Sequence, residues 1–164
     1  MFQRLRRLRA FGLAAILSSL AVTAFAQCRN DTVHLRGDWG KARFSVEVAN
    51  NAAQRTQGLM GRQTLPKASG MLFVFHRSRN LAFWMRNTFV PLDIIYLNES
   101  GTVVNIAHNT VPLDETPLPS AGPARYVLEI NAGLSKALGI APGTQLRHPA
   151  VLQHKAAWSC RDPL

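Results

Sequence analysis

Residues 70–75 read Gly-Met-Leu-Phe-Val-Phe, and they constrain the fold more than any other part of the chain. Five apolar residues in a row match the length of a β-strand that is buried on both faces. A second apolar stretch, residues 81–85, predicts another strand a few residues later. The two stretches together predict a sheet whose central strands lie inside the protein.

The sequence on either side of these stretches predicts more strands. Residues 44–48 alternate apolar and polar side chains, which is typical of a half-buried strand. Residues 94–97 and 102–107 flank Asn-Glu-Ser-Gly, a turn sequence that predicts a β-hairpin with Gly101 at the position that needs a permissive backbone. Residues 125–130 and 145–147 predict the last two strands.

Two short helices are expected among these strands. The first covers about 52–59 and is capped by Asn50 or Asn51, and the second covers about 134–138 and ends at Gly139. Four prolines in residues 111–123 predict a long ordered loop. The sequence therefore predicts an α+β fold: a mainly antiparallel β-sheet or partly closed barrel with two or three short helices.

The N-terminus has the three parts of a secretory signal peptide. Four arginines within residues 4–9 precede an apolar stretch, and Ala24-Phe25-Ala26 provides a signal-peptidase site. An uncleaved membrane anchor and a lipoprotein attached at Cys28 are weaker alternatives, because the apolar stretch is short and the lipobox is poor. The sequence predicts a signal peptide at 1–26, a single globular domain at 27–164 without a stable membrane span, and a periplasmic or secreted location.

The two cysteines, Cys28 and Cys160, lie at opposite ends of the predicted domain. In an oxidising compartment such a pair predicts a disulfide that joins the termini. The spacing differs from Cys-x-x-Cys, which argues against a redox-active role.

The predicted domain keeps 15 basic and nine acidic residues, a net charge of +6. The basic residues are scattered along the sequence. Together with the predicted location, this disfavours binding to nucleic acid.

Several motifs occur in a fixed order: Gly-Leu-Met-Gly-Arg at 58–62, the stretch at 70–75, Phe-Trp-Met-Arg-Asn-Thr at 83–88, Pro-Leu-Asp at 91–93 and Leu-Glu-Ile-Asn-Ala-Gly at 128–133. Over roughly 44–147 the chain resembles the family known as domain of unknown function 192. The resemblance implies a compact α+β domain that is often exported in bacteria, and it implies no established reaction or ligand. Thr144 stands where the family is expected to carry an acidic residue.

Polar side chains are concentrated within these apolar motifs, and those chosen as a candidate ligand site are Arg62, Trp84, Arg86, Asn87, Asp93 and Glu129. In a structural interpretation, Arg86 pairs with Asp93 or Glu129 and ties strands together. In a functional interpretation, the arginines line a cleft and bind an anionic group. Strand alternation turns Trp84 away from Phe83 and Met85, toward solvent or a pocket.

The favoured function is an accessory module of the cell envelope that binds a small ligand, a glycan or a protein partner. One alternative is an envelope hydrolase that uses Asp93 and Glu129 as a carboxylate pair. Enzymatic activity is left open, and no cofactor or metal is predicted.

A further alternative is a copper-binding protein. Its candidate ligands are Met60, Met71 and Met85 with His76 or His108. Methionines that fill gaps in the core are the preferred explanation for the same residues.

Overall fold

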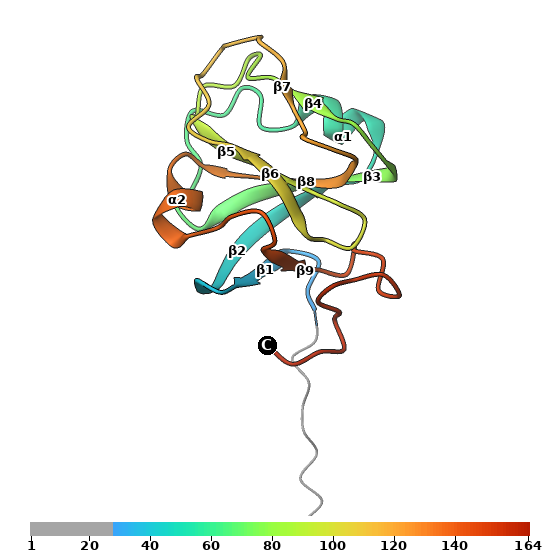
Figure 1. Cartoon of the computed structure of the whole chain (residues 1–164). Coiled ribbons are helices and arrows are strands. Elements are labelled where there is room, and N and C mark those ends of the chain that lie inside the picture. The colour runs from blue at the N-terminus through green and yellow to red at the C-terminus, as the bar shows by residue number, and fades with distance from the viewer. Residues whose placement is uncertain (1–27) are drawn as a thin grey trace, which may run out of the picture.

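The computed structural model describes residues 28–164, so the predicted signal peptide lies outside the described residues. The described chain forms a mostly β fold: a mixed seven-stranded sheet curled into a half-barrel, with two short helices (Figure 1). The strand order in this sheet is β6-β5-β8-β3-β2-β1-β9. The predicted fold class is confirmed.

The seven strands are β1 (Thr32–Gly37), β2 (Gly40–Ala49), β3 (Ser69–Arg79), β5 (Leu92–Leu97), β6 (Val103–Ala107), β8 (Ala124–Asn131) and β9 (Gln145–Arg147). A small second sheet pairs β4 (Ala82–Phe83) with β7 (Leu118–Pro119). The helices are α1 (Ala52–Gln57) and α2 (Leu134–Leu138). Both predicted helices and the predicted hairpin between β5 and β6 are confirmed.

The apolar stretch at 70–75 lies in β3, between β2 and β8 near the middle of the sheet. Met71, Leu72 and Phe73 are all buried there, as a strand covered on both faces requires. A side chain at Gly70 would collide with the backbone carbonyl of Glu129, so this glycine allows β3 and β8 to approach closely.

The sheet has a hydrophobic core on each face. Side chains that alternate along β3, β5 and β8 divide between the two, with Leu72 and Ile95 in one core and Phe73 and Ile94 in the other. The second core is completed by Leu59 and by side chains between β4 and β5. This second face of the sheet carries the pocket described below.

Four features differ from the sequence-based expectation. The β2–β3 pair is parallel, because α1 and the following loop carry the chain back before β3 starts. The strand expected at 81–85 is only the two-residue β4, and β1 was not predicted. The loop at 111–123 contains the two residues of β7.

The termini of the described chain are held together. The predicted disulfide between Cys28 and Cys160 is formed, with an S–S distance of 2.06 Å. Figure 1 shows the C-terminus beside the point where the described chain begins. Arg147 holds the C-terminal segment, because its guanidinium donates hydrogen bonds to the carbonyl oxygens of Ser159, Cys160 and Asp162 at 3.0–3.1 Å. Within residues 28–164, no helix has both the length and the apolar character needed to cross a membrane.

Candidate functional site

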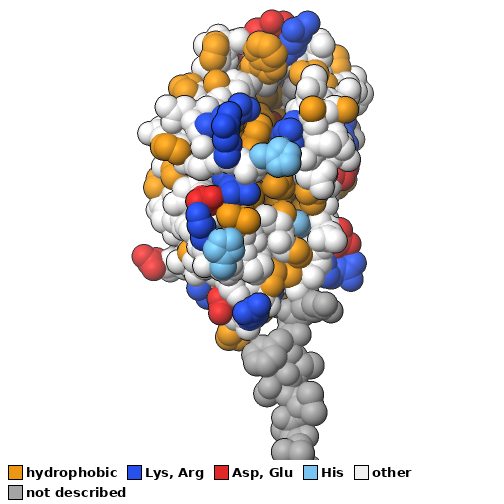
Figure 2. All heavy atoms as spheres, turned by 90° about the vertical axis from the view of Figure 1, so that its right-hand side faces the viewer, with side chains coloured by type: hydrophobic (Ala, Val, Ile, Leu, Met, Phe, Trp, Pro, Cys, Tyr) orange, Lys and Arg blue, Asp and Glu red, His pale blue; other side chains and the backbone are white. Residues whose placement is uncertain are grey.

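A pocket of about 660 Å³ opens between α1, the end of β3 and the segment that follows β4. The lining residues that determine its chemistry are Arg55, Arg79, Trp84, Arg86, Asn87 and Glu129. Figure 2 views the side of the molecule that carries α1 and β3, where basic and hydrophobic side chains lie together. The volume of the pocket falls within the range of pockets that hold small molecules.

Three arginines surround the pocket. Arg55 donates a hydrogen bond to the carbonyl oxygen of Val74 at 3.0 Å, and its guanidinium lies 5.2 Å from the ring centre of Phe75. Arg79 lies 5.5 Å from the same ring, and Arg86 lies 5.8 Å from the ring centre of Trp84. Across residues 28–164, none of these three arginines forms an ion pair. Their charges are therefore available to an anion.

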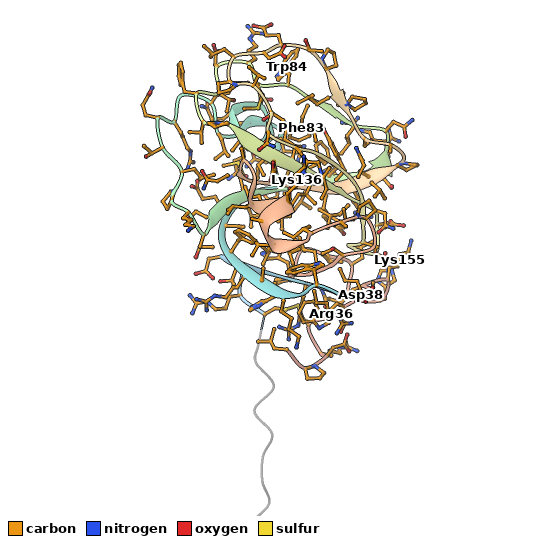
Figure 3. All side chains as sticks on the ribbon, turned by 60° about the vertical axis from the view of Figure 1, so that its left-hand side comes forward. Arg36, Asp38, Phe83, Trp84, Lys136 and Lys155 are labelled. Carbon is orange, nitrogen blue, oxygen red and sulfur yellow. A yellow bond between two sulfur atoms is a disulfide. The ribbon has the colours of Figure 1, made fainter. Side chains whose placement is uncertain are left out.

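Aromatic side chains form the apolar part of the pocket. Phe83 packs edge-on against Phe73, Phe75 and Tyr96, with ring centres 5.0–6.4 Å apart. Trp84, the next residue, is 46% exposed. Figure 3 shows Trp84 at the top of the molecule. The predicted alternation is confirmed, because Phe83 packs inward and Trp84 faces outward.

Glu129 lies at the inner end of the pocket and is only 5% exposed. Its register partners are Met71 on β3 and Ile94 on β5, so its carboxyl projects into the second hydrophobic core. Burial raises the pKa of this carboxyl to about 8. Within the described chain, no hydrogen bond from another residue satisfies it. A neutral carboxylic acid therefore faces the pocket at pH 7 and can donate a hydrogen bond.

The segment that carries Trp84 and Arg86 is fixed by its own backbone. Asn87 adopts a left-handed conformation with φ of 51°, and its carbonyl oxygen accepts a hydrogen bond from Gly61 N–H at 2.8 Å. Met85 N–H donates to the carbonyl oxygen of Asp114 at 2.8 Å. These bonds hold the segment that brings Trp84 and Arg86 to the pocket.

Asp93 lies outside this pocket, on the other face of the sheet. Its register partner is Ile130, whereas Glu129 is opposite Ile94, and adjacent residues on a strand point to opposite faces. The structure therefore separates the two carboxyls of the predicted hydrolase pair by the sheet itself. They cannot flank one bond of a substrate.

Asp93 instead joins β5 to the start of α2. Its carboxylate accepts hydrogen bonds from Ser135 N–H at 2.8 Å, from Ser135 Oγ at 2.6 Å and from Asn109 N–H at 2.8 Å. Burial opposes the charged form, but these hydrogen bonds outweigh it and lower the pKa of Asp93. The carboxylate of Asp93 therefore has a structural role and holds β5, Asn109 and the start of α2 together.

Arg62 is also separate from the pocket. It forms a two-pronged ion pair with Glu47 at 2.5 and 2.8 Å and lies beside a smaller pocket near β2. The expected pairing of Arg86 with Asp93 or Glu129 is wrong for the described residues. Arg86 packs on Trp84, Asp93 is on the other face of the sheet, and Glu129 lines the same pocket as Arg86 without forming an ion pair with it.

The methionines proposed for copper are separated from the histidines. Met71 and Met85 are buried in the second core, and the Met85 sulfur accepts a hydrogen bond from Thr110. His76 is exposed, and His108 is hydrogen bonded to Ser135 Oγ at 2.8 Å. In the described part of the chain, no three His, Cys, Asp or Glu side chains are close enough to hold a metal ion.

The structure thus brings together four of the six predicted site residues: Trp84, Arg86, Asn87 and Glu129. Sequence reasoning missed Arg55 and Arg79. Arg79 lies beyond the apolar stretch at 70–75, but β3 continues to this residue and places it beside Phe75. Arg55 is one turn into α1, and its approach to β3 could not be seen without the tertiary structure.

Comparison with known proteins gives a family match over most of the described chain. The model of the family DUF192, described as an uncharacterised ACR, matches residues 33–148. A crystal structure of a protein of unknown function from Novosphingobium aromaticivorans DSM 12444 is 47% identical, with a TM-score of 0.69 over 70% of this chain and 82% of that one.

A second solved structure is described as a putative transcription regulator from Sinorhizobium meliloti 1021. It is 40% identical, with a TM-score of 0.69 over 73% of this chain and 94% of that one. A search of curated proteins gives no match.

Proposed function

The chain belongs to the DUF192 family, and we propose that it is an exported cell-envelope module that binds a small anionic molecule with an apolar body in the pocket beside α1. The observation that carries this proposal is the set of three arginines, none of them ion paired in the described chain, around an aromatic-lined pocket. Cationic side chains that lack a carboxylate partner favour an incoming carboxylate or phosphate.

The apolar body of the ligand follows from the aromatic lining. Trp84 is nearly half exposed at the edge of the pocket, and Phe83 and Phe75 lie next to it. A flat or hydrocarbon group that covers these rings gains burial at about 25 cal/mol per Å² of apolar surface. A neutral sugar would use the aromatic rings and leave the arginines without a role, so an anion accounts for more of the pocket.

Glu129 is compatible with an anion because its raised pKa keeps the carboxyl neutral near pH 7. An ionised carboxylate in the same place would repel the ligand. The hydrolase alternative now depends on Glu129 alone, because Asp93 is on the other face of the sheet. Binding is therefore the function that the geometry supports best.

The test is an equilibrium titration by calorimetry with benzoate and phenyl phosphate as anionic probes and N-acetylglucosamine as a neutral one. Arg86→Ala is expected to weaken binding of the anions about tenfold or more, because hydrogen bonds to charged groups contribute about 1.5–3 kcal/mol. Arg43→Ala is the matched control, since Arg43 is an exposed arginine on β2 outside the pocket.

Equal losses in both variants would mean that the effect comes from net charge rather than from the pocket. Tighter binding of the neutral sugar than of either anion would replace the proposal with a glycan-binding module.

A further inference from the structure

We propose that the pocket recognises ligands with two polar ends: an anionic group held by the arginines and an uncharged hydrogen-bond acceptor, such as a carbonyl oxygen, that receives a hydrogen bond from Glu129. This inference rests on the proposed function and adds the chemistry of the ligand's inner end. It assigns Glu129 as a specificity-determining binding residue.

The position of Glu129 is the first support. The carboxyl is at the inner end of the pocket, whereas Arg79 and Arg86 are exposed near its opening. A ligand whose anion contacts the arginines therefore directs its other end toward Glu129. The rings of Phe73, Phe75 and Phe83 line the same pocket and suit an apolar connecting part.

The absence of an internal partner is the second support. No residue of the described chain hydrogen bonds to the Glu129 side chain. The hydroxyl of Tyr96 belongs to the same core but donates to the carbonyl oxygen of Leu118 at 2.5 Å. The Glu129 carboxyl lines the pocket and has no protein partner, so a ligand that completes its hydrogen bonding gains affinity and selectivity.

The protonation state determines which ligand atom fits. The ionisable groups around Glu129 are Tyr96 on β5, Arg55 on α1, Arg79 on β3 and Arg86 after β4. Burial is the cause that raises the pKa of Glu129 to about 8, and burial followed by the charge of Glu129 raises that of Tyr96. Both groups are neutral near pH 7, so Glu129 presents an O–H donor and selects an acceptor over an ammonium group.

The inference is tested with three para-substituted benzoates that share the anionic end. Para-acetylbenzoate has a carbonyl acceptor, para-isopropylbenzoate has a similar shape without an acceptor, and para-(aminomethyl)benzoate ends in a cation. At about pH 6.5 the wild-type protein is expected to bind the acetyl compound about fivefold more tightly than the isopropyl compound. This preference should shrink at about pH 9.5, where Glu129 is ionised and no longer donates.

Two substitutions distinguish the effect of a hydrogen-bond donor at position 129 from the effect of a charge there. Glu129→Gln keeps a donor of similar shape, so the preference should persist and become independent of pH. Glu129→Met removes the donor and should abolish the preference. Circular dichroism checks that both variants fold, and if Glu129→Met does not fold, the wild-type and Glu129→Gln results decide alone.

The inference is overturned if the acetyl and isopropyl compounds bind equally, if the aminomethyl compound binds best, or if Glu129→Gln removes the preference. In each of these cases, benzoates that still bind and still lose affinity in Arg86→Ala leave the proposed function standing. If no benzoate binds the wild-type protein at millimolar concentration, the proposed function fails, and the inference fails with it.

Discussion

Replacing Asp93 with asparagine is expected to destabilise the protein without changing the pocket. Asp93 is fully buried and accepts three hydrogen bonds, two from Ser135 and one from the backbone of Asn109. Gly133, the residue before α2, has no side chain to cap the helix, and the carboxylate of Asp93 satisfies the N–H of Ser135 in its place. The substitution therefore weakens the connection between β5, α2 and the loop at Asn109.

The expected loss is about 3 kcal/mol in the free energy of unfolding. A hydrogen bond to a charged group contributes about 1.5–3 kcal/mol, and asparagine retains one of the two acceptor oxygens. Its NH₂ group then faces an N–H donor and leaves at least one buried donor unsatisfied. Because small domains are stable by about 5–15 kcal/mol, a loss of this size is readily measured.

The assay is urea unfolding at pH 7 with the disulfide intact. Ser135→Ala is the graded control, because it removes the hydroxyl bonds to Asp93 at 2.6 Å and to His108 at 2.8 Å and keeps the N–H bond, so it should cost about 1–2 kcal/mol. The pKa of Asp93 is lowered on folding, so its stabilising effect is complete above the unfolded value near 3.8 and is lost as pH falls through the folded value. The difference between wild type and Asp93→Asn should therefore shrink in acid.

Two results would refute this reasoning. One is an unchanged urea midpoint in Asp93→Asn, which would mean that the three hydrogen bonds contribute nothing. The other is a folded and stable variant that has lost affinity for benzoate, which would make Asp93 part of the binding machinery.

Two further predictions concern stability. Replacing Cys28 and Cys160 together with serine should lower the free energy of unfolding by about 5 kcal/mol, because the bridge closes a loop with a sequence separation of 132. An unchanged urea midpoint would contradict this. The Glu129 carboxyl has a folded pKa of about 8 and a reference value of 4.5, so wild-type stability should fall as pH rises between these values. Glu129→Gln should lack this slope in urea titrations across the same range, and an identical slope in both proteins would show that another group causes it.

Local sequence signals predicted most elements of the fold. The apolar stretch in β3, the glycine-containing turn before β6 and the glycine after α2 each act over a few residues, so their meaning is independent of distant parts of the chain. The disulfide was also predictable, since only one pairing of two cysteines exists.

Features that depend on long-range pairing were not predictable in this way. The parallel pairing of β2 with β3 depends on the path of the chain through α1. The separation of Asp93 from Glu129 depends on the register between β5 and β8, which fixes the face that each side chain takes. The sequence places the two acids in similar motifs and says nothing of that register.

The candidate site illustrates the same limit. Trp84 and Arg86 could be chosen because they are neighbours in one motif. Arg55 and Arg79 come from different elements and meet only at the ring of Phe75. Their roles became visible when the folded chain brought α1 against the end of β3.

The most direct test of the ligand pocket is to follow the three tryptophan indole N–H signals by NMR while para-acetylbenzoate is added. The indole N–H of Trp39 donates a hydrogen bond to Thr144 Oγ1, and that of Trp158 donates to the carbonyl oxygen of Pro163. Neither residue lines the pocket, whereas Trp84 does. Trp84→Phe assigns the third signal. If the ligand binds in the pocket, the Trp84 signal shifts saturably and the signals of Trp39 and Trp158 stay in place. No shift of that signal, or equal shifts of all three, would contradict it.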